Sequence, residues 1–301
     1  MAKLIKMNLN TDTYKVPTNE DIKLAKQYVL RRSGAVDEGW ALASDVINDA
    51  VEELVRIAYK YNIPAERFSF DSSVSQSMMD EVTEIMDRMD EEIYEILVGE
   101  ALACSDDENE RDNLLSYLQS LGHRNMDLRQ TMHAYEWRML HQVGGLIAAA
   151  LFAGLILSSA IKNIQKYVSN VRQNPYLGKT SKYKQLFVSP FVRNNESVGF
   201  PDGSHNIQGV PFDGYNAIKQ IYGIAIAQIW MKNQLYEMQE SGCAGYYQLR
   251  GSEFPCALCD DEVGFHEGVN IDDEPFPHPH CMCYRVPIYR NGEIGESASG
   301  V

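Results

Sequence analysis

Cysteines and histidines gather near the C-terminal end of the sequence at spacings that suit a metal ion. Four of the six cysteines and three of the seven histidines fall within the 28 residues from Cys256 to Cys283. Two thiolates separated by two residues can bind one metal from a single turn, and a second pair brought back by a loop completes a tetrahedron. Cys256 and Cys259 form the first such pair. The cluster therefore predicts a zinc site in preference to free or disulfide-bonded thiols.

The second ligand pair can be drawn in two registers. His278 and Cys281 have the same spacing as His280 and Cys283, offset by two residues. Prolines on both sides of His278 stiffen this strip, so we expect only one register to present its ligands well. Either register gives the metal four protein ligands and no open position, which is typical of a structural zinc ion.

These residues resemble the C-terminal signature of the phage Mu F-like minor head proteins, the phage head morphogenesis family. The signature consists of Cys-x-x-Cys, a variable loop, Pro-x-His-Pro-x-Cys-Arg-Cys and an apolar strand that contains a proline. The sequence departs from it at Met282, where the family usually has arginine, and at Val263-Gly264, where it usually has Asp-Gly. The matching residues are Cys256, Cys259, His278, Pro279, Cys281 and Cys283, followed by Val286-Pro287-Ile288.

The resemblance implies a ligand set, a function and a location. The expected zinc ligands are Cys256, Cys259, His278 and Cys281, with Cys283 or His280 as the alternative fourth ligand. The family implies a non-enzymatic minor head protein of a tailed phage or prophage, acting at the portal vertex or inner capsid in head assembly or DNA delivery. Its partners would be the portal protein and other phage head proteins, and this role also allows contact with packaged DNA without sequence specificity. The chain would be made in the host bacterial cytoplasm and end in the virion.

Composition places the chain among ordinary globular proteins. Its 301 residues are 45% apolar, enough for one large domain or two average ones. The first residues contain lysines but no sustained apolar stretch, so we expect no secretory signal and a reducing compartment, where clustered cysteines favour metal over disulfides. Cys104 and Cys243 lie outside the cluster and are expected to be buried thiols.

Negative charge is concentrated in one segment. The chain has a net charge of −15, and residues 71–112 contain fifteen acidic and two basic side chains, a net charge of −13. Such a block repels a phosphate backbone, so we do not expect sequence-specific DNA binding. The block is interpreted first as a solvated helix face, and second as an acidic surface that docks on a basic partner.

The spacing of apolar residues predicts a mainly α fold, with a helical N-terminal region and a small α+β zinc-knuckle-like C-terminal subdomain. Helices are expected from Thr18 to about Ser33-Gly34, from Ala35 to Tyr61 and from Ser73 or Ser75 onward. The third helix has an apolar stripe at alternating intervals of three and four, formed by Met79, Val82, Met86, Met89, Ile93 and Ile96.

The remaining elements complete the expected domain organisation. A helix is expected over residues 215–238 and a strand over residues 245–249, leading into the first cysteine pair. Turn dipeptides crowd the preceding stretch and predict a long irregular arm. The expected regions are an extended tail over 1–16, a helical domain over 17–172, the arm over 173–212, a Mu F-like domain over 213–291 and a flexible tail over 292–301.

A long uncharged run leaves a second class of function open. Val143 to Ile161 contains nineteen residues without a charge, which reaches the length of a transmembrane helix. Its flanks have little charge asymmetry and no aromatic belt, so we favour a buried core helix. The alternative is a membrane-associated protein with one span at 143–161 and a cytoplasmic zinc module.

A third interpretation is a zinc-site nuclease of the His-Asn-His type, which also uses Cys-x-x-Cys knuckles. The residues His266, Glu267, Asp272, Asp273 and Glu274 could supply its base. Such nucleases normally need a paired catalytic histidine and a following helix, and the sequence after Cys283 offers no helix pattern. Acidic loops beside a zinc knuckle are more often solvated than catalytic, so we do not expect an enzyme.

Overall fold

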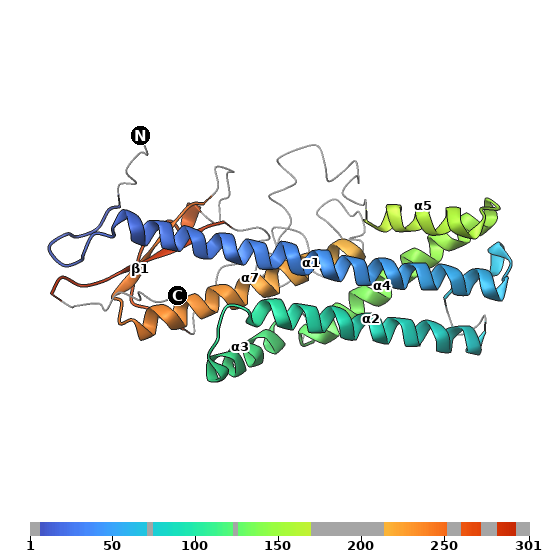
Figure 1. Ribbon diagram of the computed structural model, residues 1–301, viewed down its shortest axis with the longest axis horizontal. Coiled ribbons are helices and arrows are strands. Elements are labelled where there is room, and N and C mark those ends of the chain that lie inside the picture. The colour runs from blue at the N-terminus through green and yellow to red at the C-terminus, as the bar shows by residue number, and fades with distance from the viewer. Residues whose placement is uncertain are drawn as a thin grey trace.

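A computed structural model describes residues 7–70, 75–122, 126–169, 214–251, 260–271 and 282–292. It is mostly helical, with a three-stranded antiparallel sheet in the C-terminal region, which confirms the predicted mainly α class with a small α+β part. Figure 1 shows an elongated bundle in which the longest helix, α1, runs from the sheet at one end to the far end of the bundle. The predicted arm over 173–212 lies outside the described residues.

Helix α1 spans Asn19–Tyr61 without interruption. The Thr18 side chain accepts from the Asp21 backbone N–H and the Asp21 carboxylate accepts from the Thr18 backbone N–H, which closes a capping box. The predicted stop at Ser33-Gly34 is wrong. A glycine inside a helix costs about 1 kcal/mol, and the burial of Arg32 and Ala35 beside it outweighs that cost.

Helix α2 spans Gln76–Leu102 and packs along α1. The Ser75 hydroxyl accepts from the Met78 backbone N–H and caps the helix, which confirms the second of the two predicted starts. The middle of the predicted stripe, from Val82 to Ile93, is buried. At its ends Met78 and Leu97 are buried in place of their neighbours Met79 and Ile96, because a straight helix drifts relative to a 3.5-residue repeat.

The uncharged run over 143–161 divides between two helices, α4 (Leu128–Phe152) and α5 (Leu157–Ser169), so the predicted single core helix is wrong. Gly154 takes a left-handed conformation with φ 66° and donates to the Leu151 carbonyl at 3.0 Å, while Leu155 donates to the Ala150 carbonyl at 3.0 Å. These two bonds form a Schellman ending. In the described part of the chain, no helix is long and apolar enough to cross a membrane.

The remaining helices close the bundle. The short helix η1 (Ala65–Arg67) connects α1 to α2, and α3 (Glu108–Ser120) buries its apolar side against α7. Helix α7 (Gly214–Glu240) lies against α1, α2 and α4. Its fully buried members include Ile218, Ile221, Tyr222, Ala225, Ile226 and Ile229. Because α7 also reaches the C-terminal sheet, the helical and C-terminal regions share this helix.

The sheet has the strand order β2-β1-β3. Its strands are β1 (Gly245–Leu249), β2 (Gly264–Glu267) and β3 (Tyr284–Ile288), and both pairings are antiparallel. The predicted strand over 245–249 is confirmed, whereas β2 was not predicted. Pro287 lies in β3, an edge strand, where a residue without an N–H is tolerated.

The sheet packs over the beginning of α1 together with the first described residues. Val286 and Ile288 share a core cluster with Ala25 and Val29 of α1. Lys15 donates its backbone N–H to the Tyr289 carbonyl at 2.8 Å, so residues near the N-terminus lie beside the C-terminal strand. The segments 1–6 and 293–301 of the two predicted tails lie outside the described residues.

Candidate functional site

Of the predicted zinc ligands, Cys283 alone lies among the described residues. Cys256, Cys259, His278, His280 and Cys281 lie outside the described residues. Cys283 is described: it is buried immediately before β3, and its backbone carbonyl accepts from Arg32 at 3.5 Å.

The residues that border the two ligand-bearing segments meet at one end of the sheet. Leu249, the last residue of β1, is paired with Tyr284, the first residue of β3. Just beyond β1, Arg250 forms an ion pair with Asp260. A Cβ atom on Gly251 would lie 1.7 Å from the Met282 carbonyl oxygen, so the backbones approach closely there. The residues on both sides of segment 252–259 therefore lie close to residue 282, which follows segment 272–281.

His266 and Glu267, which the nuclease interpretation offers as a source of its base, both make contacts within the fold. His266 is stacked on Tyr246 with ring centroids 4.8 Å apart, and its Nε2 lies 2.9 Å from the Glu262 carbonyl. Glu267 accepts a hydrogen bond from the Tyr14 hydroxyl at 2.9 Å. The acidic residues 272–274 lie outside the described part of the chain.

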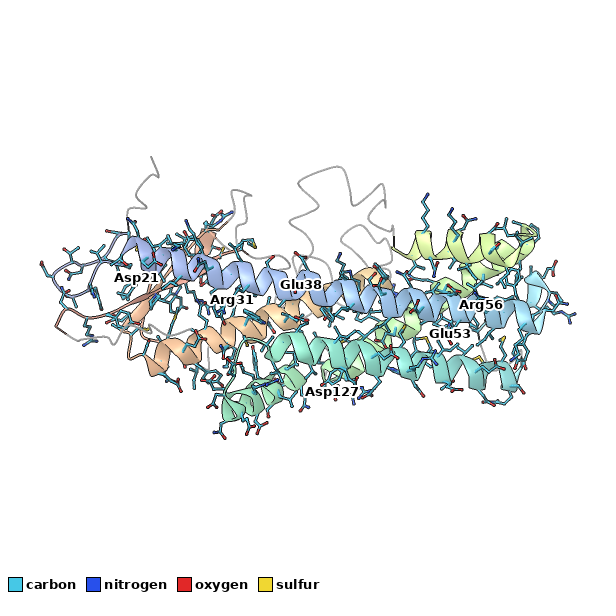
Figure 2. The ribbon with its side chains drawn as sticks, in the orientation of Figure 1. Asp21, Arg31, Glu38, Glu53, Arg56 and Asp127 are labelled. Carbon is cyan, nitrogen blue, oxygen red and sulfur yellow. The ribbon has the colours of Figure 1, made fainter. Side chains whose placement is uncertain are left out.

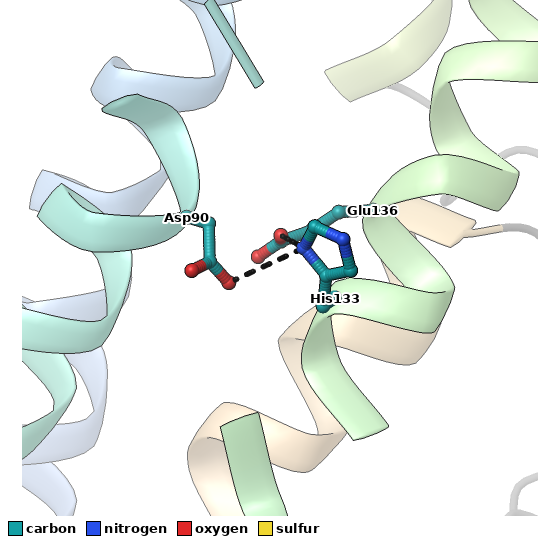
Figure 3. A group of neighbouring side chains, drawn as sticks. All are labelled: Asp90, His133 and Glu136. Carbon is teal, nitrogen blue, oxygen red and sulfur yellow. Dashed lines mark ion pairs between the residues drawn. The ribbon is translucent and has the colours of Figure 1, made fainter. Parts of the chain in front are cut away.

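A second group of potential ligands lies inside the helical bundle, where sequence reasoning did not predict one. Asp90 on α2 faces His133 and Glu136 on α4 (Figure 3). The His133 Nδ1 atom lies 3.8 Å from Asp90 Oδ1 and 3.8 Å from Glu136 Oε2. One ligand atom from each residue lies within 4.8 Å of the other two, so the group could hold a metal ion.

Arg129, one turn before His133 on α4, fixes one side of this group. Its Nε donates to Asp90 Oδ2 at 2.9 Å and its Nη2 lies 2.8 Å from the same oxygen. The same guanidinium also pairs with Glu91, which is exposed. Asp90 is thus held by the arginine through Oδ2 while Oδ1 faces His133.

Glu136 is the unusual member. Its side chain is 0% exposed, and among the described residues neither carboxylate oxygen has a hydrogen-bond donor. Burial raises the pKa of this carboxyl well above its usual range, and the neighbouring Asp90 carboxylate raises it further. Leaving Glu136 ionised without a hydrogen-bond donor costs at least about 1–3 kcal/mol, so the site favours either a proton or a cation there.

The hydrogen bond of His133 to Trp137 defines the imidazole tautomer. The Trp137 indole N–H donates to His133 Nε2 at 2.7 Å. An indole is only a donor, so Nε2 carries no hydrogen and the neutral ring has its proton on Nδ1, which faces the carboxylates.

The acidic surface of α2 is mostly solvated. Asp80, Glu84, Asp87, Glu92 and Glu95 are exposed, whereas Asp90 is buried. Two pairs cross to α1: Glu53, labelled in Figure 2, meets Arg88 at 2.6 Å, and Lys60 meets Glu81 at 2.6 Å. Exposed ion pairs of this kind contribute about 0–1 kcal/mol each. A solvated helix face therefore accounts for the acidic surface of α2 without a docking partner.

Comparison with known proteins gives no independent assignment. No protein-family model, no curated protein and no solved structure matches the chain.

Proposed function

We propose that the chain is a non-enzymatic minor head protein of a tailed phage or prophage whose C-terminal domain is held together by a structural zinc ion. The expected partners are the portal protein and other head proteins. The support is the resemblance of the Cys/His pattern, together with the order of helix α7 and strands β1, β2 and β3 along the chain, in which the cysteine pair falls between β1 and β2 in the sequence.

One observation carries the zinc part of the proposal. The described residues Gly251 and Met282 approach closely, and Arg250 pairs with Asp260, at the sheet end where both ligand-bearing segments begin or finish. A tetrahedral site requires two ligand pairs, distant in sequence, to be delivered to one place. The pairing of β1 with β3 satisfies that requirement for the borders of the segments.

The size of the C-terminal core gives a physical reason for a metal. Among the described residues, the core cluster beneath the sheet has eight buried members, and the outer strands of the sheet, β2 and β3, are edges. Small domains with little apolar core usually need a disulfide or a metal to remain folded. Zinc would supply that stabilisation in a reducing cytoplasm.

Metal analysis of the purified full-length chain tests the zinc proposal. We expect one zinc ion per chain by inductively coupled plasma mass spectrometry, and its loss in the Cys256→Ser/Cys259→Ser double variant. The matched control, Cys104→Ser/Cys243→Ser, removes the same number of thiols outside the cluster and should retain the metal. Wild-type protein without zinc, or equal zinc in both double variants, would overturn the assignment.

Loss of the chain in a phage-producing strain tests the head role separately. We expect fewer DNA-filled heads by electron microscopy when the gene is disrupted, and restoration by the wild-type chain. Normal numbers of filled, infectious particles without the chain would exclude a necessary role in head assembly.

A further inference from the structure

The strongest unassigned feature is the buried carboxylate of Glu136 and the groups that face it. Glu136 is fully buried on α4, and both of its oxygens lack a donor among the described residues. Asp90 adds a second carboxylate from α2, also buried. Arg129 pairs with Asp90 and Glu91 but not with Glu136, so the guanidinium does not neutralise the second buried carboxylate beside the imidazole.

The separations suit a single cation. Bonds of about 2.1 Å to oxygen and nitrogen allow two ligands to lie up to about 4.2 Å apart across a metal. The two separations from His133 Nδ1, to Asp90 Oδ1 and to Glu136 Oε2, are each 3.8 Å and fall inside that limit. All three ligand atoms lie within 4.8 Å of one another, so side-chain rotation that shortens the remaining separation would place them around one ion.

The group also has an open side. The His133 side chain is 42% exposed and that of Asp90 is 10% exposed, whereas Glu136 is closed off. Solvent can enter past the imidazole, which gives a cation an entry path and leaves room for water ligands. Arg129 holds Asp90 Oδ2 from behind, as outer hydrogen bonds commonly orient a metal-binding carboxylate.

We propose that Asp90, His133 and Glu136 bind a divalent cation of hard to borderline character in the helical bundle, with water completing its coordination. Carboxylates suit hard ions such as Mn²⁺ and an imidazole suits borderline ions, whereas a soft ion such as Cu⁺ requires thiolate or thioether ligands that this group lacks. The proposal does not depend on the head role or on the cysteine cluster.

Trp137 makes binding observable. Ligation through His133 Nδ1 removes the hydrogen from that atom, and the neutral ring then has its proton on Nε2. Nε2 can no longer accept from the indole N–H, so the 2.7 Å hydrogen bond must break. Cation binding should therefore change the environment of the Trp137 indole, which lies one helical turn from His133.

The test is a titration of the full-length protein, as purified, with MnCl₂, following free Mn²⁺ by electron paramagnetic resonance. We expect one bound Mn²⁺ per chain, a higher Tm, and a change in tryptophan fluorescence that is absent in Trp137→Phe. Glu136→Gln should lose the binding, while Glu92→Gln, which removes an exposed carboxylate of the same bundle, should retain it.

The variants separate binding from folding. The glutamine introduced by Glu136→Gln has the same size as glutamate and adds an amide donor next to Asp90, so circular dichroism should show an unchanged fold. Cys256→Ser/Cys259→Ser should still bind Mn²⁺, because the thiolates are not its ligands. Absence of stoichiometric Mn²⁺ binding by the wild type, or equal binding by Glu136→Gln, would overturn the proposal.

Discussion

Replacing Glu136 by glutamine should stabilise the metal-free protein, although it removes a charged group from the centre of the bundle. The wild-type carboxyl is fully buried, and its oxygens have no donor among the described residues. Glutamine keeps the shape, carries no charge and can donate its amide N–H to Asp90. The variant therefore loses the desolvation penalty without leaving a cavity.

The expected effect depends on pH in a defined direction. Burial first, and then the Asp90 carboxylate, raise the pKa of Glu136 above its usual range. A raised pKa in the folded state means that the protonated carboxyl is fully stabilising below its ordinary pKa, and that this stability is lost as pH rises through the raised pKa. The advantage of Glu136→Gln should therefore be small near pH 4 and should grow toward neutral and alkaline pH.

The magnitude follows from the burial of an unsatisfied group. One buried polar group without a partner costs about 1–3 kcal/mol, so the variant should gain that much free energy of unfolding at pH 8. For a chain of this size the gain corresponds to a rise in Tm of roughly 2–6 °C. Thermal melts from pH 4 to pH 9 in metal-depleted buffer measure it, with Glu92→Gln as the exposed control.

Two results would contradict an unsatisfied, titrating Glu136. If Glu136→Gln were less stable than the wild type at pH 8 without metal, the carboxylate would have a stabilising partner that the described contacts lack. If its advantage did not change with pH, then Glu136 would not titrate on unfolding in this range.

Three further changes test the packing and the C-terminal domain. Gly34→Ala should stabilise by about 0.5–1 kcal/mol in urea unfolding, because its Cβ meets no atom within 4 Å and alanine favours the helix; destabilisation would argue for a break in α1. Gly39→Ala should cost about 1–3 kcal/mol, because its Cβ would lie 2.3 Å from the hydroxyl oxygen of the buried Tyr222; an unchanged midpoint would contradict that contact. Cys256→Ser/Cys259→Ser should expose the chain beyond residue 240 to limited proteolysis while the bundle fragment survives, and unchanged resistance there would count against a structural metal.

The ends of α1 could be predicted from sequence because they depend on neighbouring residues. Thr18 and Asp21 cap each other, and Asn62 ends the helix in a left-handed conformation before Ile63-Pro64. Continuity through Gly34 could not be predicted in the same way. It depends on the packing of the turns on either side against other parts of the chain, and a local pattern does not contain that information.

The glycines of the uncharged run over 143–161 show the same dependence on packing. Gly144 remains in α4, where a Cβ would lie 3.1 Å from the Phe70 ring, whereas Gly154 adopts a left-handed conformation and ends the helix. The residue type is the same, but one position faces a packed ring and the other has open space. Apolar composition therefore located neither this turn nor the exposed apolar residues beside it, Phe152 and Ile156.

The bundle site was hidden because its ligands are separated along the sequence and meet only through packing. Asp90 lies four residues after Met86 and three before Ile93, on the buried side of α2, which was the available signal for an unusual carboxylate. His133 and Glu136 are three residues apart, a spacing that places both on one face of a helix. The sequence does not show that α2 packs against α4, so it could not show that Asp90 lies beside His133 and Glu136.

Quantitative mass spectrometry of purified phage particles, from a strain that encodes the chain, tests the proposed role as a minor head protein. We expect the chain to be present in the particles at low copy number relative to the major capsid subunit. Its absence from the particles, together with abundance in the lysate of the same cells, would contradict membership of the virion.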